Sequence, residues 1–63
     1  MIKYYVIDEG WGINVFPSSM FDDEGRYFED PNINLADMDI IATFNDADRA
    51  WDYAEKMQDA LYE

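Results

Sequence analysis

The sequence predicts an α+β fold in which a small antiparallel sheet of three or four strands packs against one C-terminal helix. Short apolar segments separated by turn residues fill the first three quarters of the 63-residue chain. The last quarter, residues 47–62, contains no Gly, Pro or β-branched residue. An aromatic share of 17% separates the chain from disordered acidic segments. The length allows one domain, covering residues 1–63.

A hairpin is predicted at the N-terminus. Residues 1–7 form a strand whose two faces are both apolar, which is typical of a central strand. Two glycines in the turn at residues 8–12 are free to adopt positive φ angles. Residues 13–16 form the second strand, which Pro17 ends or places at an edge.

The middle of the chain is predicted to return to the sheet. A third strand at residues 26–28 follows an acidic loop in which Gly25 suits the left-handed position. Residues 29–32 break the strand pattern. Asn34 caps one helical turn at residues 34–38, and residues 40–44 form the last strand.

The C-terminal helix is the clearest element, capped by Asn45 or Asp46. Its apolar residues follow the three-to-four spacing of a single buried stripe. They are Ala47, Ala50, Trp51, Ala54, Met57 and Leu61. The small alanines predict a close approach of the helix to the sheet.

The net charge is the unusual feature. Fifteen acidic residues oppose four basic ones, which gives a formal net charge of −11. Solubility requires a magnitude of only about 2–8, and more destabilises the compact state by self-repulsion. Nucleic acid and anionic membranes are excluded as direct partners, and a basic protein is favoured.

The location is expected to be cytoplasmic, including the host cytoplasm for a virus-encoded protein. No segment reaches the roughly 18 apolar residues of a membrane span, and the first residues lack the basic and apolar pattern of a leader. The absence of cysteine fits a reducing compartment.

The acidic residues form two groups that are predicted to bind a partner. Five recur every three or four residues along the helix, opposite its apolar stripe. They are Asp48, Asp52, Glu55, Asp59 and Glu63. Five more lie in two loops: Asp22, Asp23, Glu24, Glu29 and Asp30. Two interpretations stay open, a solvated face and a row of carboxylates that stands in for phosphates.

The chain contains few residues of the types that catalysis or metal binding requires. The chain has no His and no Cys, and its only serines are Ser18 and Ser19, so no familiar nucleophile–base pair exists. The calcium-loop pattern does not occur. We therefore predict no enzyme activity, no metal site and no cofactor.

Eleven aromatic residues exceed what one sheet–helix interface buries. Trp11 in its glycine-flanked turn, and Tyr27 or Phe28 beside the acidic loop, are the candidates for exposure. Exposed aromatics next to acids suit a protein-binding hot spot or the interface of a homodimer.

In size, charge and the acidic face of its helix, the chain resembles small phage-encoded inhibitors that mimic DNA. These include antirestriction proteins, uracil-DNA glycosylase inhibitors and anti-CRISPR proteins. The resemblance is one of class and carries no motif. It implies an inhibitor that occupies the basic nucleic-acid-binding channel of a host defence or repair protein.

Two alternatives remain beside this resemblance. One is an interaction or regulatory module for a basic protein, without mimicry of nucleic acid. The other is adaptation to high salt, which would make the charge a property of the environment and not of a site.

Overall fold

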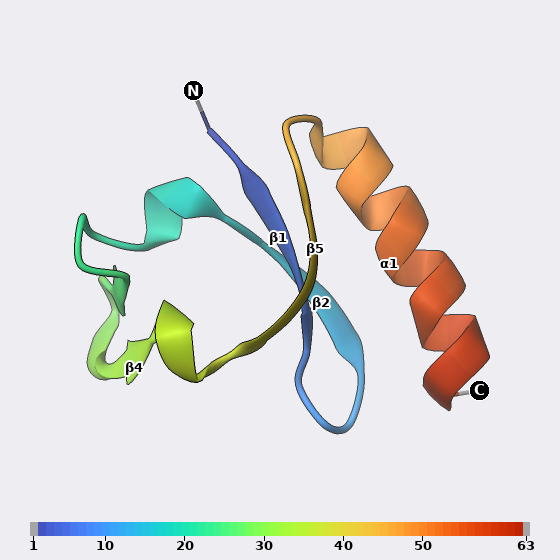
Figure 1. Cartoon of the computed structure of the whole chain (residues 1–63), viewed down its shortest axis with the longest axis horizontal. Helices are drawn as coiled ribbons and strands as arrows, with labels where there is room; N and C mark the ends of the chain where they lie inside the picture. The colour runs from blue at the N-terminus through green and yellow to red at the C-terminus, as the bar shows by residue number, and fades with distance from the viewer. Residues whose placement is uncertain (1, 63) are drawn as a thin grey trace.

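A three-stranded antiparallel sheet forms the centre of the structure, a computed structural model that describes residues 2–62. Its strands are β1 (Tyr4–Asp8), β2 (Ile13–Pro17) and β5 (Asp39–Phe44), in the order β2-β1-β5. The helix α1 (Ala47–Tyr62) covers one face of this sheet (Figure 1). The predicted α+β class and the central position of the first strand are confirmed.

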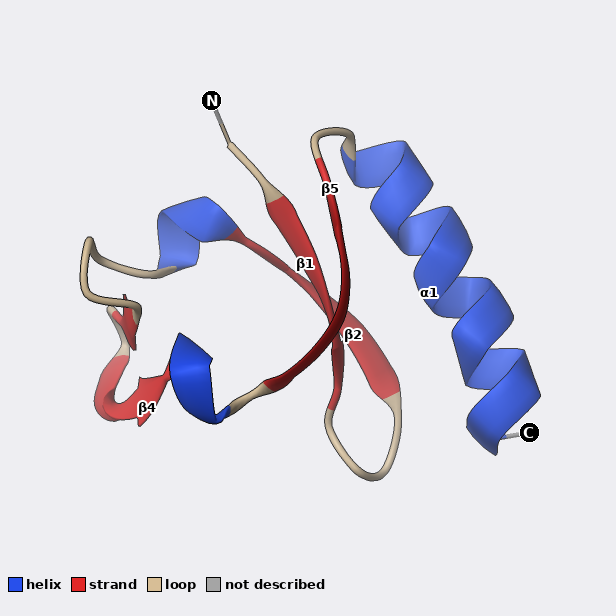
Figure 2. Cartoon of the chain, in the orientation of Figure 1, coloured by secondary structure: helices blue, strands red, loops and turns tan. Residues whose placement is uncertain are grey.

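A smaller unit lies on the opposite side of the sheet from α1 (Figure 2). It contains two single turns of 3-10 helix and a second, two-stranded sheet. These elements are η1 (Ser18–Met20), β3 (Arg26–Tyr27), β4 (Asp30–Asn34) and η2 (Leu35–Asp37). The molecule therefore has three layers, with the main sheet in the middle.

The β1–β2 hairpin closes through a two-residue loop, Gly10-Trp11. The Glu9 N–H donates to the Gly12 carbonyl over 2.9 Å, and Asp8 pairs with Ile13 next to this bond. Gly10 has a φ of +86°, which suits glycine at the first central position of such a loop. The second turn glycine, Gly12, does not have a positive φ.

Strand β5 carries a bulge where it pairs with β1. Val6 pairs with Ala42 and Ile7 pairs with Ile40, so Ile41 is an extra residue in β5. A bulge lets a strand add one residue while its neighbours keep their faces. Both Ile41 and Ala42 consequently pack against the core between the sheet and α1.

The core between the sheet and the helix is small and closely packed. Val6 and Val15 meet Ala50 and Ala54, and each of these four side chains is at most 7% exposed. Alanine lets the helix axis approach the sheet closely, as predicted from the sequence. The ring of Tyr53 lies 5.5 Å from that of Phe44 at the border of this core.

A second apolar cluster fills the other face of the sheet. The ring of Phe21 lies 6.2 Å from Tyr5, 6.3 Å from Phe16 and 5.7 Å from Tyr27, mostly edge to face. Ile7 is buried beneath the same face. The aromatic excess is thus used in part to build a second core.

The middle of the chain contradicts one prediction and confirms another. The sequence predicts that residues 29–32 interrupt the strands, and this is wrong, because β4 begins at Asp30 and pairs with β3. Pro31 is tolerated because this strand is an exposed edge. The bridge between Phe21 and Tyr27, with Gly25 at a φ of +83°, confirms the expected loop.

Both predicted caps are present. The Asn34 side chain accepts a hydrogen bond from the Ala36 N–H at 2.9 Å, which begins η2. Asp46 accepts from the Asp48 N–H at 2.9 Å, which begins α1. Short polar side chains before each turn therefore locate both elements.

The predicted buried stripe of the helix is only partly correct. Ala50 and Ala54 are buried, but Trp51 is 52% exposed and Leu61 is 54% exposed. The last turn of α1 still lies beside the sheet, because Tyr62, one residue after Leu61, donates to Asp8 at the end of β1. Towards its C-terminus Gln58 and Tyr62, instead of Leu61, contact the β1–β2 hairpin.

Candidate protein-binding surfaces

Four carboxylates form a ridge along the solvent side of α1. Asp48, Asp52, Glu55 and Asp59 are all exposed and follow one another at three or four residues, so neighbours stand about 5–6 Å apart. We call these four residues the acidic ridge. The fifth predicted member, Glu63, lies outside the described residues.

The acidic ridge is not neutralised within the part of the chain that the structure describes. The one ion pair found among residues 2–62 joins Arg26 and Glu24, far from α1 in the sequence. In the same range, neither Arg49 nor Lys56 forms an ion pair with the ridge. Like charges at this spacing cost about 0.2–0.5 kcal/mol per pair. The ridge therefore offers its negative charges to a partner.

An apolar pocket adjoins the acidic ridge. It has a volume of about 290 Å³ and is lined by Ile13, Trp51, Ala54, Glu55 and Gln58. Glu55 thus belongs to both the pocket and the ridge. A half-exposed Trp beside charges is typical of a binding hot spot. The helical spacing predicts Trp51 as part of the buried stripe, and its position at the border of that stripe was the signal for this exposure.

The loop acids mostly stabilise their own loops. Asp22 accepts hydrogen bonds from the backbone N–H groups of Glu24 and Arg26, at 2.8 and 2.9 Å. Glu24 pairs with Arg26 at 3.0 Å. Glu29 accepts a hydrogen bond from the Tyr27 hydroxyl at 3.1 Å. Desolvation raises the pKa of Tyr27, and the carboxylate of Glu29 raises it further. These bonds give the loop acids a structural role.

The last two loop acids differ from each other. Asp30 accepts from the Asn32 N–H at 3.1 Å, so it also stabilises its own turn. Asp23 is exposed and forms no hydrogen bond or ion pair with any residue in the range 2–62. Asp23 is therefore the one loop acid of the five that has no hydrogen bond or ion pair within the described range.

The two acidic groups lie at opposite ends of the molecule. Figure 1 places α1 at one end of the longest axis, which measures 32 Å, and the β3–β4 unit at the other. The sequence left open whether the groups share a surface. The structure separates them, because the main sheet stands between the helix and the small unit.

Trp11 is the most exposed large apolar side chain among the described residues, at 76%. It is at the tip of the β1–β2 hairpin, as predicted. Phe28 is also exposed, at 64%, whereas Tyr27 is half-buried against Phe21. The exposed aromatics Trp11, Phe28 and Trp51 therefore lie on two loops and on α1.

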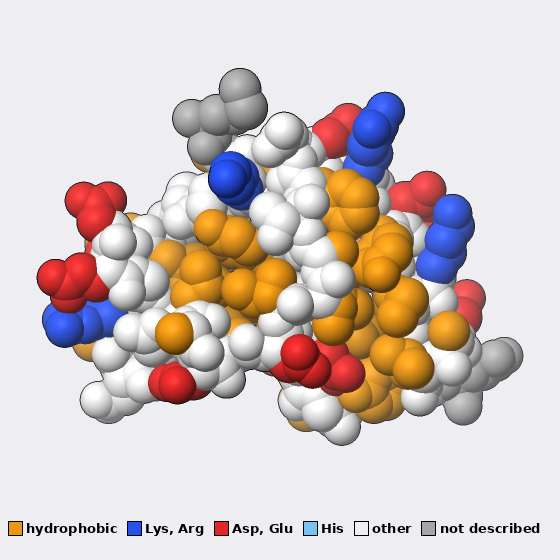
Figure 3. Space-filling model, in the orientation of Figure 1, with side chains coloured by type: hydrophobic (Ala, Val, Ile, Leu, Met, Phe, Trp, Pro, Cys, Tyr) orange, Lys and Arg blue, Asp and Glu red, His pale blue; other side chains and the backbone are white. Residues whose placement is uncertain are grey.

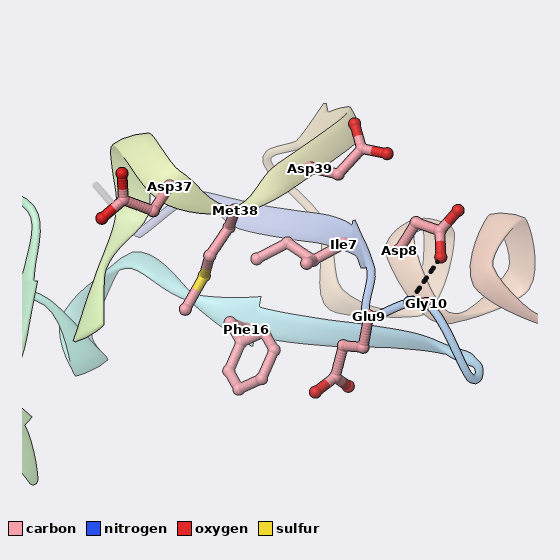
Figure 4. Close-up of a pocket in the computed structure, with 8 residues that line it drawn as sticks. All are labelled: Ile7, Asp8, Glu9, Gly10, Phe16, Asp37, Met38 and Asp39. Atoms are coloured by element: carbon pink, nitrogen blue, oxygen red, sulfur yellow. Dashed lines mark hydrogen bonds between the residues drawn. The ribbon is translucent and has the colours of Figure 1, made fainter.

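A third group of acids, which the sequence analysis missed, surrounds a pocket of about 450 Å³. The side chains of Ile7, Phe16 and Met38 form its apolar floor. The carboxylates of Asp37 and Asp39 point away from Ile7 and Met38 (Figure 4). Asp8 and Glu9 complete its rim. We call Asp8, Glu9, Asp37 and Asp39 the pocket acids.

The pairing of β1 with β5 brings the pocket acids together. Asp8 and Asp39 are direct cross-strand partners. Like charges at such positions destabilise a sheet by a few tenths of a kcal/mol to about 1 kcal/mol. The sequence does place Asp8 at the end of one apolar segment and Asp39 at the start of another. This pattern predicts a shared acidic group only when the two strands are known to be neighbours.

Asp8 is held in its charged form by the end of α1. Its carboxylate accepts one hydrogen bond from the Tyr62 hydroxyl and another from the Gly10 N–H at 2.9 Å. Both bonds lower the pKa of Asp8, and the bond from Tyr62 is the larger cause. The same bond with Asp8 is the largest cause that raises the pKa of Tyr62, and the charge of Asp39 adds to it. These groups tie the C-terminal turn of α1 to the first hairpin.

Among residues 2–62, no cluster of three potential ligands could hold a metal ion. No helix in the same range is long and apolar enough to cross a membrane. In comparisons with protein-family models, curated proteins and solved structures, nothing matches this chain. Its fold and its charged surfaces are therefore the basis for a functional proposal.

Proposed function

We propose that this protein is an acidic inhibitor that covers the basic, nucleic-acid-binding surface of another protein. The acidic ridge of α1, unpaired within the described range and adjoined by the Trp51 pocket, carries this proposal. Ordered carboxylates steer a basic partner towards the helix and make association fast and salt-dependent. Trp51 supplies the desolvated contact that charge alone does not give.

A host defence or repair protein is the kind of target that the resemblance to phage inhibitors suggests. The separation of the loop acids from α1 keeps those acids out of a contact with the ridge. Because duplex DNA carries one charge per roughly 1.7 Å of axis, a single ridge imitates only a short stretch of backbone.

The second candidate is an interaction module whose basic partner does not bind nucleic acid. The separation of the loop acids from the ridge favours this candidate, since a long phosphate-like face would join them. Competition distinguishes the two. Duplex DNA added to the complex displaces an inhibitor that mimics nucleic acid and leaves an ordinary module bound.

The test compares two triple variants of equal net charge. One replaces Asp52, Glu55 and Asp59 of the ridge by Lys, and the matched control replaces Asp23, Glu24 and Glu29 of the loops by Lys. Each variant has a net charge of −5 instead of −11, since every substitution changes −1 to +1. Capture of basic proteins from lysate is expected to be lost in the ridge variant and kept in the control. Equal binding by both variants would contradict a role for the ridge.

A further inference from the structure

The two edges of the main sheet are treated differently by the rest of the chain. Glu9 N–H bonds the Gly12 carbonyl, and Ser18 N–H bonds the Lys3 carbonyl, at the two ends of the β1–β2 ladder. Hydrogen-bonded and non-bonded pairs alternate in an antiparallel ladder. The peptide groups of Ile13, Val15 and Pro17 are therefore turned outward from β1.

None of the three residues of β2 that face outward offers a free N–H group to a further strand. Ile13 N–H donates to the Gln58 side-chain oxygen at 2.7 Å, and Val15 N–H donates to the Asn14 side-chain oxygen at 2.8 Å. Pro17 has no N–H. The β2 edge is thus closed to a further strand.

The β5 edge is open. The same alternation turns Tyr4, Val6 and Asp8 of β1 towards β5, and it leaves the peptide groups of Ile40 and Thr43 facing outward. Within the described range, no side chain or loop donates to or accepts from these two residues outside the ladder. Strand β5 contains no Pro or Lys, two residues that commonly protect edges. Its protective features are the bulge at Ile41 and the charge of Asp39 at its first residue.

Apolar surface lies on both sides of this edge. Figure 3 shows a band of backbone and polar atoms along the course of β5, with hydrophobic side chains to either side of it. Ile40 is 38% exposed on the face opposite α1, and Leu61 is 54% exposed on α1. Ile41 and Phe44 are half-buried on the helix side. A strand added here would gain backbone hydrogen bonds and cover apolar area.

The charge around β5 selects the occupant. Between Arg26 and Arg49 the sequence has six acids and no Lys or Arg. Asp37 and Asp39 lie at one end of β5, and Asp46 and Asp48 follow its other end. A second copy of the chain would bring the same acids and a net charge of −11, so self-pairing is opposed.

We propose that the β5 edge binds an extended segment of a basic protein, in which apolar residues and Lys or Arg alternate, as an added antiparallel or parallel strand. This inference rests on the proposed function, since it assigns a second contact to the same basic partner. The pocket at the Asp39 end has an apolar floor for the aliphatic stem of a Lys or Arg, and its acidic rim receives the charged end.

The test uses a ten-residue peptide of alternating Lys and Val as the probe and the isotope-labelled wild-type protein. Binding is expected to shift the amide resonances of β5 and to slow hydrogen exchange at Ile40 and Thr43 by about tenfold or more. A Lys–Gly peptide of equal charge is expected to bind at least about tenfold more weakly, because it covers no apolar area. Resonance shifts confined to α1 would overturn the inference.

Two substitutions at one position test the strand pairing. Thr43→Pro removes an outward N–H, and peptide affinity is expected to fall by about tenfold. Thr43→Val keeps the N–H and the β-branch, and is expected to bind within about twofold of wild type. Wild-type affinity in folded Thr43→Pro would contradict pairing at β5. The exchange measurement on the wild type decides the question if Thr43→Pro does not fold.

The ridge triple variant separates this inference from the proposed function. If it loses the peptide while Thr43→Pro keeps it, the ridge is the binding surface and the β5 inference is wrong. If Thr43→Pro loses the peptide while the ridge variant keeps it, β5 is the binding surface for the extended segment. The capture of basic proteins by the two triple variants then decides the ridge proposal separately. Sedimentation is expected to show a monomer, and a dimer abolished by Thr43→Pro would make the occupant a second copy.

Discussion

At the scale of single residues, Tyr62 and Asp8 show how the chain uses part of its charge for its own structure. The carboxylate of Asp8 faces Asp39 across two strands, a repulsive arrangement. The Tyr62 hydroxyl offsets this by donating to Asp8. Since Asp8 is charged for a structural reason, one member of the pocket acids is already committed before a partner arrives.

Replacing Tyr62 by Phe tests this contact through pH. The pKa of Asp8 is expected to rise towards its ordinary value of 3.8, because the largest cause of its depression is removed. A depressed pKa of a carboxyl stabilises the fold above the ordinary pKa, and this contribution is lost as the pH falls through the folded-state pKa. The raised pKa of Tyr62 acts in reverse: its contribution is complete below the ordinary value of 10.0 and is lost as the pH rises through the folded-state pKa.

The free-energy difference between wild type and Tyr62→Phe should therefore be largest between these two limits and smaller outside them. Denaturant unfolding as a function of pH measures it, and the carboxyl resonance of Asp8 reports the pKa directly. Tyr53→Phe is the control, since the Tyr53 hydroxyl has no hydrogen bond among residues 2–62. A pH-independent difference would contradict this role for Tyr62.

At the scale of elements, the helix shows which properties periodicity can and cannot predict. Its bounds and cap follow from local preferences, because the Asp46 side chain and the absence of Gly and Pro act within a turn or two. Which residues of the apolar stripe become buried depends on which side of each turn faces the sheet. Ala50 and Ala54 are buried against it, whereas Gln58 and Tyr62 take this place in the last turns and Leu61 is exposed.

Enlarging a buried alanine should reveal how tightly the helix packs. Ala50 is fully buried, so Ala50→Leu is expected to lower the free energy of unfolding by about 1–3 kcal/mol through overpacking. Ala60→Leu adds the same side chain at an exposed position and should change it by no more than about 0.5 kcal/mol. Urea unfolding of both variants gives the comparison. Equal effects would mean that α1 does not approach the sheet as closely as described.

At the scale of the whole molecule, charge opposes the compact state. The net charge is −11, and the described residues contain one ion pair that offsets it. Salt screens repulsion between exposed charges within a Debye length of about 10 Å at 0.1 M. Since the acids lie in three groups, repulsion within each group is the main contribution to be screened.

The melting temperature is therefore expected to rise with sodium chloride between about 10 mM and 0.5 M, over which the Debye length shortens severalfold. The ridge triple variant should show a smaller rise, because three of its negative charges are replaced by Lys. Adaptation to high salt predicts a different result, an unfolded chain at the lowest salt. A circular dichroism melt at each concentration distinguishes the two.

The α+β class, the central first strand, both caps, the limits of the helix and the row of acids along it could all be predicted from the sequence. These features depend on interactions between residues a few positions apart, or on the number of charged residues. Features that depend on strand order and on the position of each layer became known only from the folded structure. It placed the loop acids far from the ridge, brought Asp8 beside Asp39, exposed Trp51 and left the β5 edge open. Such contacts join residues that are distant in the chain, so no local pattern encodes them.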